Sequence, residues 1–159
     1  MTTGGSGHRV TLRRAGEGDG ALLREWRNDA DAVRFSATAR PVSPEAHARW
    51  LAARLADSDT RLWIAEEARV PVGQVRVDLA DGSGVVSIAV AAVARGGGIG
   101  QAMLRAAIEE IAREDAAIQL RALIHPDNIA SLRAFERVGF RRVSSDERGF
   151  VVLELAVSG

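Results

Sequence analysis

Apolar residues follow a strand pattern and then helical patterns in the first third of the chain. Apolar and polar side chains alternate over Val10–Arg14, which predicts a short strand. Apolar residues recur at helical spacing over Ala21–Asn28. A second helix is predicted from Ser43 to about Leu55, because its Ser-Pro-Glu start combines an N-cap, a first-turn proline and a first-turn acid. The residues between the two helices, Asp29–Val42, are predicted to be irregular.

The middle of the chain alternates in the manner of strands and then becomes helical. Three segments separated by short turns, Arg61–Glu66, Val70–Leu79 and Val85–Val93, predict an antiparallel meander. A glycine-rich segment, Arg95–Gly100, follows the third strand. It leads into Gln101–Arg113, whose apolar residues occupy one face of a helix.

The last third predicts a strand, a helix and two closing strands. The strand covers Ile118–Ile124, and the helix covers Ile129–Arg137 with Gly139 just past its end. Phe140–Val143 and Phe150–Val157 are predicted to complete the sheet. The whole order predicts a mixed α+β domain of about seven strands and four helices.

Composition agrees with one globular domain. The chain has 159 residues, of which 47% are hydrophobic and 26% charged, so it has enough apolar surface to form a core. Residues 1–7 are small and polar and predict a disordered N-terminus before a single domain over residues 8–159. The longest nearly uncharged run, Gly82–Ala94, is too short to span a bilayer. No secretory signal is visible, so we expect a cytoplasmic protein without a membrane partner.

Charge and residue usage exclude several kinds of chemistry. Lys+Arg and Asp+Glu are both 21, and all the cations are arginine, so lysine-based covalent catalysis is excluded. The balanced charge gives no sign of a nucleic-acid partner. Cys is absent, and the three histidines, His8, His47 and His125, are far apart in sequence. We therefore predict no metal site.

The segment Arg95-Gly96-Gly97-Gly98-Ile99-Gly100-Gln101 carries the sharpest functional signal. It lies between a strand and a helix, where glycines allow a tight turn and the first helical N–H groups lack partners. With the helix dipole, these groups form an anion site suited to a pyrophosphate. A plain flexible turn is the alternative. A nucleoside triphosphate loop needs a Lys, and a dinucleotide fingerprint needs a small residue where Met103 stands, so both are disfavoured.

Two motifs together indicate a family. Arg95-x-x-Gly98-x-Gly100 resembles the coenzyme A loop of the GCN5-related N-acetyltransferase (GNAT) superfamily, and Asn128-x-x-Ser131-x-x-x-Phe135-x-x-x-Gly139-Phe140 resembles its second signature. The resemblance implies a three-layer α/β arrangement with a central, mixed, mostly antiparallel sheet. It also implies that the fourth and fifth strands splay apart. The implied activity is N-acetyl transfer, with acetyl-coenzyme A as co-substrate and no metal.

The resemblance also assigns binding roles. Strand residues would hold the pantetheine arm through their backbone, loop amides would hold the pyrophosphate, and residues of the second signature would line the same channel. The coenzyme-binding set is Ile88, Ala89, Val90, Arg95, Gly96, Gly97, Gly98, Ile99, Gly100, Gln101, Asn128, Ser131 and Phe135.

Phe135 departs from the pattern, because many members have there a Tyr taken to protonate the leaving thiolate. The chain has no Tyr. A water or another side chain could give the proton, the thiolate could leave unprotonated beside the helix N-terminus, or the domain could bind coenzyme and catalyse poorly.

The acceptor amine must be neutral to attack, so a base is expected. Glu25, His47 and His125 are the candidate catalytic residues, and each has a purely structural alternative. The acceptor candidates resemble those of bacterial acetyltransferases that act on nucleotide-linked amino sugars in pseudaminic-type (nonulosonic) acid pathways. They are Trp26, Arg27, Asn28, Arg34 and Trp50.

Several alternatives to a nucleotide-linked amino sugar as the acceptor remain. Trp26 and Trp50 could instead anchor the core. The acceptor could be a protein N-terminus or an aminoglycoside-type amine, or the domain could be a non-catalytic acyl-coenzyme A binder. The expected partner is a small-molecule amine. The resemblance leaves a homodimer open.

Overall fold

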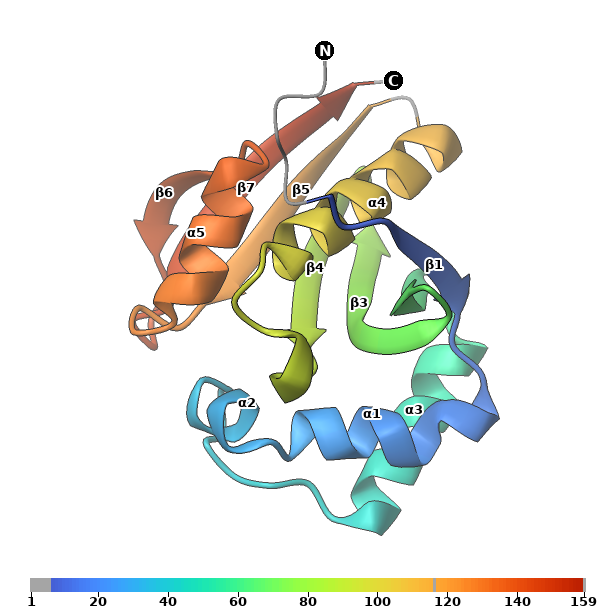
Figure 1. Ribbon diagram of the computed structural model, residues 1–159. Coiled ribbons are helices and arrows are strands. Elements are labelled where there is room, and N and C mark those ends of the chain that lie inside the picture. The colour runs from blue at the N-terminus through green and yellow to red at the C-terminus, as the bar shows by residue number, and fades with distance from the viewer. Residues whose placement is uncertain (1–6, 116, 159) are drawn as a thin grey trace.

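A seven-stranded sheet forms the middle layer of the computed structural model, which describes residues 7–115 and 117–158 (Figure 1). Its strand order is β1-β2-β3-β4-β5-β7-β6. All neighbours pair antiparallel except β4 and β5, which are parallel. The strands are β1 (Val10–Arg14), β2 (Thr60–Glu67), β3 (Val70–Ala80), β4 (Ser83–Val90), β5 (Ala117–Ile124), β6 (Arg141–Ser145) and β7 (Val151–Ser158). The predicted mixed sheet is confirmed. Of the predicted disordered segment 1–7, all but Gly7 lies outside the described residues.

Helices cover both faces of the sheet because strand residues alternate between them. On β2, Trp63 and Ala65 join a core shared with α4 (Ile99–Glu114) and α5 (Ile129–Arg137). Leu62 and Ile64 join a second core on the other face. That second core is shared with α1 (Gly20–Arg27) and α3 (Pro44–Ala56). The expected three-layer arrangement is therefore present.

The segment predicted to be irregular contains an additional helix. Residues Ala30–Arg34 form α2, and the Asp29 carboxylate caps it by accepting from the N–H groups of Asp31 and Ala32 at 3.2 and 3.3 Å. The described residues therefore contain five α-helices instead of about four. A helix of five residues is too short to show a helical period, so only its cap residue signalled it.

The third strand of the meander ends earlier than predicted. β4 ends at Val90, and Ala92–Ala94 form a 3-10 turn instead of continuing the strand to Val93. The apolar run Val90–Val93 is longer than the strand, whose pairing with β3 ends where the Ala91 N–H donates to the Val72 carbonyl at 2.8 Å. The chain then turns towards the glycine-rich loop.

β4 and β5 pair along only part of their length. Ser83, Gly84 and Val85 pair with Gln119, Leu120 and Arg121, and no further pairs follow among the described residues. Beyond Val85, β4 continues to Val90 while paired with β3 on its other side. The predicted splay between the fourth and fifth strands is confirmed.

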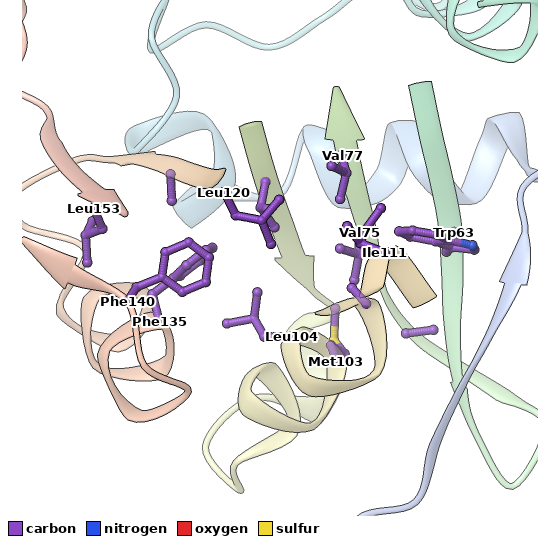
Figure 2. Close-up of a cluster of buried hydrophobic side chains, with 14 of the residues drawn as sticks. Trp63, Val75, Val77, Met103, Leu104, Ile111, Leu120, Phe135, Phe140 and Leu153 are labelled. Atoms are coloured by element: carbon purple, nitrogen blue, oxygen red, sulfur yellow. The ribbon is translucent and has the colours of Figure 1, made fainter. Parts of the chain in front are cut away.

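Two phenylalanines of the second signature anchor α5 in the larger core (Figure 2). Phe135 and Phe140 are each 2% exposed, and their rings meet edge to face at 5.0 Å between centroids. Gly139 between them has φ 113°, a left-handed conformation that lets the chain reverse directly into β6. The edge-to-face geometry adds to the stabilisation that burial of the rings supplies.

Replacing Phe140 with Ala is expected to lower the free energy of unfolding by about 3–5 kcal/mol, because it empties a ring-sized volume in the core. Urea denaturation measures the change. Val143→Ala is the matched control, since Val143 is 52% exposed on the next strand and its change should stay within about 0.5 kcal/mol. Equal effects at the two positions would contradict the core position of Phe140.

Candidate active site

The glycine-rich loop ends in an uncapped helix N-terminus. Gly96 and Gly98 have φ 89° and 83°, which L side chains rarely adopt. Gly98 is the N-cap of α4 and provides no side-chain cap. The helix ladder starts with the Ala102 N–H, which donates to the Gly98 carbonyl at 3.2 Å. The N–H groups of Ile99, Gly100 and Gln101 therefore precede the ladder and, with the helix dipole, form an anion site.

This helix terminus packs against the splayed strand at Gly100. A Cβ at Gly100 would lie 3.6 Å from Ile88 Cδ1 and 3.7 Å from both Val90 Cγ2 and Ala134 Cβ. The first turn of α4 thus contacts the end of β4 and the body of α5. The segments predicted to bind the pantetheine arm and the pyrophosphate are therefore adjacent in the structure, and their contacts with the coenzyme stay predictions.

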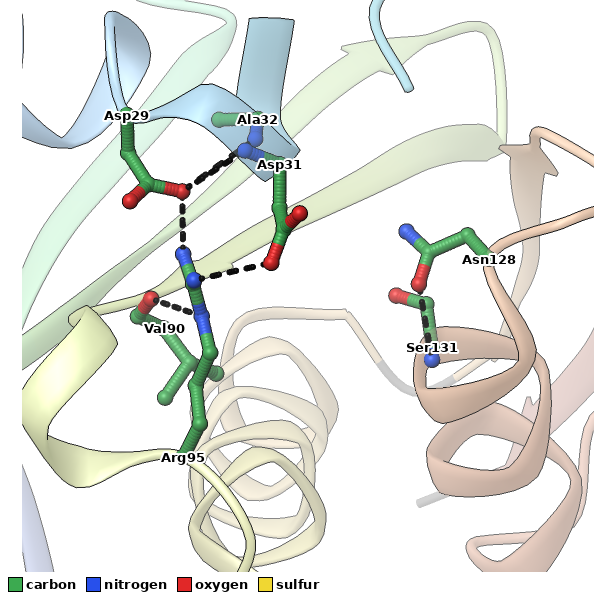
Figure 3. Close-up of polar contacts among 7 residues, drawn as sticks. All are labelled: Asp29, Asp31, Ala32, Val90, Arg95, Asn128 and Ser131. Carbon is green, nitrogen blue, oxygen red and sulfur yellow. Dashed lines mark hydrogen bonds and ion pairs between the residues drawn. The ribbon is translucent and has the colours of Figure 1, made fainter. Parts of the chain in front are cut away.

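Arg95 ties the loop to β4 and α2 (Figure 3). Its Nε donates to the Val90 carbonyl at 3.1 Å, Nη2 donates to Asp29 Oδ2 at 2.7 Å, and Nη1 donates to Asp31 Oδ2 at 3.3 Å. The hydrogen bond from Arg95 holds the pKa of Asp29 below its usual value. Two carboxylates therefore balance the charge of Arg95. Its predicted contact with a pyrophosphate stays a prediction.

Asn128 and Ser131 lie at the start of α5, across from Arg95 in Figure 3. Asn128 Oδ1 caps the helix by accepting from the Ser131 N–H at 3.3 Å. Within the described part of the chain, the Asn128 amide nitrogen and the Ser131 hydroxyl make no hydrogen bond that the structure records, so both can serve a ligand. Phe135, one turn further on, packs in the core, and its predicted contact with the coenzyme stays a prediction.

His47 is a buried, neutral candidate base. It is 4% exposed and lies 5.4 Å, centroid to centroid, from the Trp50 ring. Burial, reinforced by the charges of Arg24 and Arg27, lowers the pKa of His47 from its usual value. Its side chain lines a groove of about 410 Å³ between α1 and α3, which Arg24 also lines. Glu25, the second candidate, is exposed on α1.

His125 belongs to an aromatic cluster built from three distant segments. Its ring lies 5.4 Å from Phe35 and 5.5 Å from Phe150. The guanidinium carbons of Arg34 and Arg148 lie 4.9 and 4.6 Å from the Phe35 and Phe150 rings. Phe35, Phe150 and Arg148 were missed from the sequence because only the tertiary fold brings them to His125.

A hydrogen bond also sets the tautomer of His125. Its Nδ1 accepts from the Asp127 N–H at 3.1 Å, so the neutral ring carries its proton on Nε2. A ring in this state donates from Nε2 and cannot accept there. This geometry favours His47 over His125 as the neutral base.

Two of the predicted acceptor residues are used by the fold itself. Trp26 is 7% exposed in the core beneath α1 and α3, which supports its alternative as a core anchor. Both ends of the Asn28 amide bind the backbone of Val42, at 2.7 and 2.8 Å, and close the loop before α3. Their predicted contacts with substrate stay predictions.

The remaining acceptor candidates present cationic and aromatic groups. Arg34 is exposed on α2. Trp50 lies under the guanidinium of Arg76, 5.4 Å from its carbon to the ring centroid. Arg27 Nη1 and Gln74 Oε1 are buried without a hydrogen-bond partner among the described residues, which is rare in folded proteins. Arg76 and Gln74, both on β3, are further residues that the sequence patterns did not single out.

Metal ligands and membrane spans are the two remaining features of interest. In residues 7–115 and 117–158, no three His, Asp or Glu side chains gather in a way that could hold a metal ion. Over the same residues, no helix is both long and apolar enough to cross a bilayer.

Comparison with known proteins decides the family. The family model described as "Acetyltransferase (GNAT) domain" matches residues 9–141. The chain belongs to this family. It is thus an acetyltransferase domain, and the expected GNAT fold and enzyme class are confirmed. Membership of the GNAT family also supports the expectation that acetyl-coenzyme A is the co-substrate of this chain.

Individual relatives add detail. The chain is 27% identical over 149 residues to aminoglycoside N(6')-acetyltransferase type 1 of Klebsiella pneumoniae, covering 84% of this chain and 74% of the relative. A domain from Methanocaldococcus jannaschii superposes with TM-score 0.84 at 21% identity, covering 94% of this chain and 99% of the other. The structure of AAC(6')-Ib with ribostamycin and coenzyme A superposes with TM-score 0.77 at 24% identity, covering 94% and 93%. None of these is named as an enzyme of a pseudaminic-type pathway.

Gly98→Asp is expected to weaken coenzyme A binding at least about 100-fold, or about 2.7 kcal/mol. It strains a left-handed residue and adds a carboxylate at the anion site. Isothermal calorimetry measures the affinity. Gly149→Asp is the control, because Gly149 also has a left-handed φ of 85° and a Cβ there would meet nothing within 4 Å. A similar loss in both variants would contradict the assignment of the anion site.

His47 is expected to make the fold sensitive to acid. Its pKa is lowered in the folded chain, so the unfolded chain takes up a proton first as the pH falls below 6.5. Stability from the neutral ring is complete above pH 6.5 and declines towards lower pH. His47→Gln should therefore lose less stability than wild type between pH 7.5 and 5, as urea denaturation at each pH would show. If wild type and His47→Gln lost the same free energy of unfolding between pH 7.5 and 5, the buried neutral state of His47 would be refuted.

Proposed function

We propose that the chain transfers an acetyl group from acetyl-coenzyme A to the primary amine of an amino sugar that carries negative charge, of which a nucleotide-linked amino sugar is the expected form. Two parts of the structure support this proposal. One is the donor site formed by the loop, the end of β4 and the start of α5. The other is a set of arginine and tryptophan side chains on the α1 and α3 side of the sheet.

The donor site fits the coenzyme through its backbone. The uncapped α4 terminus suits a pyrophosphate, and β4 beyond Val85 has backbone groups without a described strand partner on the side of β5. A pantetheine amide can bind such groups as a strand would. Bound there, acetyl-coenzyme A supplies the acetyl group as a thioester. Backbone N–H groups of β4 can polarise its carbonyl.

The charged side chains on the α1 and α3 side of the sheet determine which substrate we propose. Arg27 has a buried Nη1 without a partner among the described residues, and its pKa is lowered from its usual value by burial. Neither Arg27 nor Arg34 forms an ion pair with any of the described residues. The nearby carboxylates Asp29 and Asp31 are already paired with Arg95. An unpaired guanidinium suits a phosphate, which it can bind through two parallel hydrogen bonds.

The same side offers what an amino sugar needs. The indole of Trp50 can stack on a sugar or base face. His47 is held neutral by its environment and is the candidate that takes the proton from the attacking amine.

An aminoglycoside amine is the second candidate. It is supported by the 27% identity to an aminoglycoside N(6')-acetyltransferase and by Glu25, which is exposed on α1 and can meet a cation. Aminoglycosides carry several positive charges, so the unpaired arginines oppose their binding. Both candidates present an amine on a sugar, and the charge of the rest of the molecule separates them.

A thiol-release assay with a panel of acceptors tests the proposal. The panel contains a UDP-linked 4-amino sugar, the same sugar without the nucleotide, kanamycin and a short peptide with a free N-terminus. The expected result is the highest kcat/KM with the UDP-linked sugar. Arg27→Gln and Arg34→Gln should each lower that value about 10-fold, with the KM for acetyl-coenzyme A unchanged.

Arg113→Gln is the matched control, because Arg113 is exposed in the last turn of α4 and pairs only with Glu110 among the described residues. It should leave all parameters unchanged. A preference for kanamycin or the peptide would overturn the acceptor class. Coenzyme binding without transfer to any amine would favour a non-catalytic binding domain.

A further inference from the structure

His8 joins the glycine-rich loop to the end of β2. It lies just before β1, and its Nδ1 is 2.6 Å from Glu67 Oε2 at the end of β2. Its Nε2 is 2.6 Å from the carbonyl oxygen of Gly97 in the loop. A Cβ on Gly97 would lie 3.1 Å from His8 Nε2, so the ring packs directly on the loop backbone. None of the motifs singled out His8.

The two partners determine the charge of the ring. An ionised carboxylate and a backbone carbonyl only accept hydrogen bonds, so both ring nitrogens must donate. A neutral imidazole has a single N–H, and therefore this geometry requires the imidazolium form. The hydrogen bond to Glu67 raises the pKa of His8, against the opposing effect of burial.

The other charged side chains around His8 leave the ion pair between His8 and Glu67 intact. Glu66, next to Glu67, is bound by Arg13 at 3.1 Å. Arg95 in the loop is paired with Asp29 and Asp31. Arg9 on the same segment and Arg69 in the β2–β3 turn are exposed to solvent. Glu67 is thus the charged group that contacts the ring.

We propose that protonated His8 is a positioning residue for the coenzyme: it orients the Gly97–Gly98 peptide and places a positive charge beside the pyrophosphate site. The Gly97 carbonyl and the Gly98 N–H belong to one planar peptide and point in opposite directions. By holding the carbonyl, His8 turns the N–H of the helix N-cap away from itself. It also offsets the partial negative charge of a carbonyl oxygen near a bound polyanion.

Coenzyme binding and protonation of His8 should therefore favour each other. A nearby pyrophosphate stabilises the imidazolium, and by reciprocity the imidazolium strengthens pyrophosphate binding. When His8 loses its proton, one of its two hydrogen bonds is lost as well. Coenzyme affinity should be complete below the raised pKa of His8 and fall as the pH rises through it. That pH range lies above the ordinary value of 6.5.

The test is the dissociation constant of the coenzyme between pH 6 and 9, measured by calorimetry. The probe is 3′-dephospho-coenzyme A, because the terminal phosphate of the complete coenzyme titrates in the same range. Wild type should bind about 3- to 10-fold more weakly at pH 9 than at pH 6, which corresponds to a shift of about 0.5–1 pKa unit on binding. His8→Gln should bind weakly at both ends and show a flat profile.

Two further variants separate this role from a loss of folding. Glu67→Gln keeps a hydrogen-bond acceptor but removes the charge, so it should move the affinity change to lower pH. Glu110→Gln is the control on the outer face of α4, where Glu110 pairs with Arg113, and should keep the wild-type profile. With saturating acetyl-coenzyme A, kcat should be unchanged in His8→Gln while the KM for the coenzyme rises.

The role of His8 rests on the coenzyme use proposed above. Different experimental results would overturn the proposed function and the role of His8. A wild-type protein that melts cooperatively but binds no coenzyme at any pH would overturn the proposed function. Coenzyme binding with the same pH profile in wild type and His8→Gln would overturn the role of His8 alone. A wild-type profile in Glu67→Gln would also contradict the role of the Glu67–His8 pair, even if His8→Gln failed to fold.

Discussion

The early parting of β4 and β5 is the constraint on which the candidate site depends. The two strands pair over three residues, and beyond them the backbone of β4 has no described strand partner on that side. Unpaired backbone groups are costly when they are buried away from water. The first turn of α4 packs at Gly100 against Ile88 and Val90, so the helix terminus and the unpaired strand edge lie together. One ligand with a polar arm and a phosphate end can satisfy both.

Three anchors hold the glycine-rich loop, which has little rigidity of its own. Arg95 binds Val90, Asp29 and Asp31, His8 binds Gly97, and Gly98 continues into α4. These contacts come from β4, α2 and the segment before β1. A loop held in this way loses less conformational freedom when it binds a ligand, and preorganisation of this kind increases affinity.

Local signals identified the donor side of the site, while the acceptor side needed the fold. The loop and the Asn128 signature are each continuous in sequence, and the structure brings Gly100 of the loop close to Ala134 within the signature. Trp26 has the same residue type as Trp50 and lies on a similar helix, yet Trp26 is in the core while Trp50 is half-buried beneath Arg76. Phe35, His125 and Phe150 come together from segments that have no common pattern. The helix α2 was missed because it is too short to show a period.

The sequence by itself determined the seven strands, four of the five described helices, their order and the uncapped glycine-rich helix terminus. Strand and helix periods, caps and glycine conformations are local properties that a few neighbouring residues set. The tertiary structure alone decided which arginines are paired, which tryptophans are buried and which histidine lies between a carboxylate and a backbone carbonyl. Arg95 is far along the chain from both Asp29 and Asp31, and His8 is far from both Gly97 and Glu67. Charge and hydrogen-bond state depend on distances of a few ångströms across the fold, which no local pattern specifies.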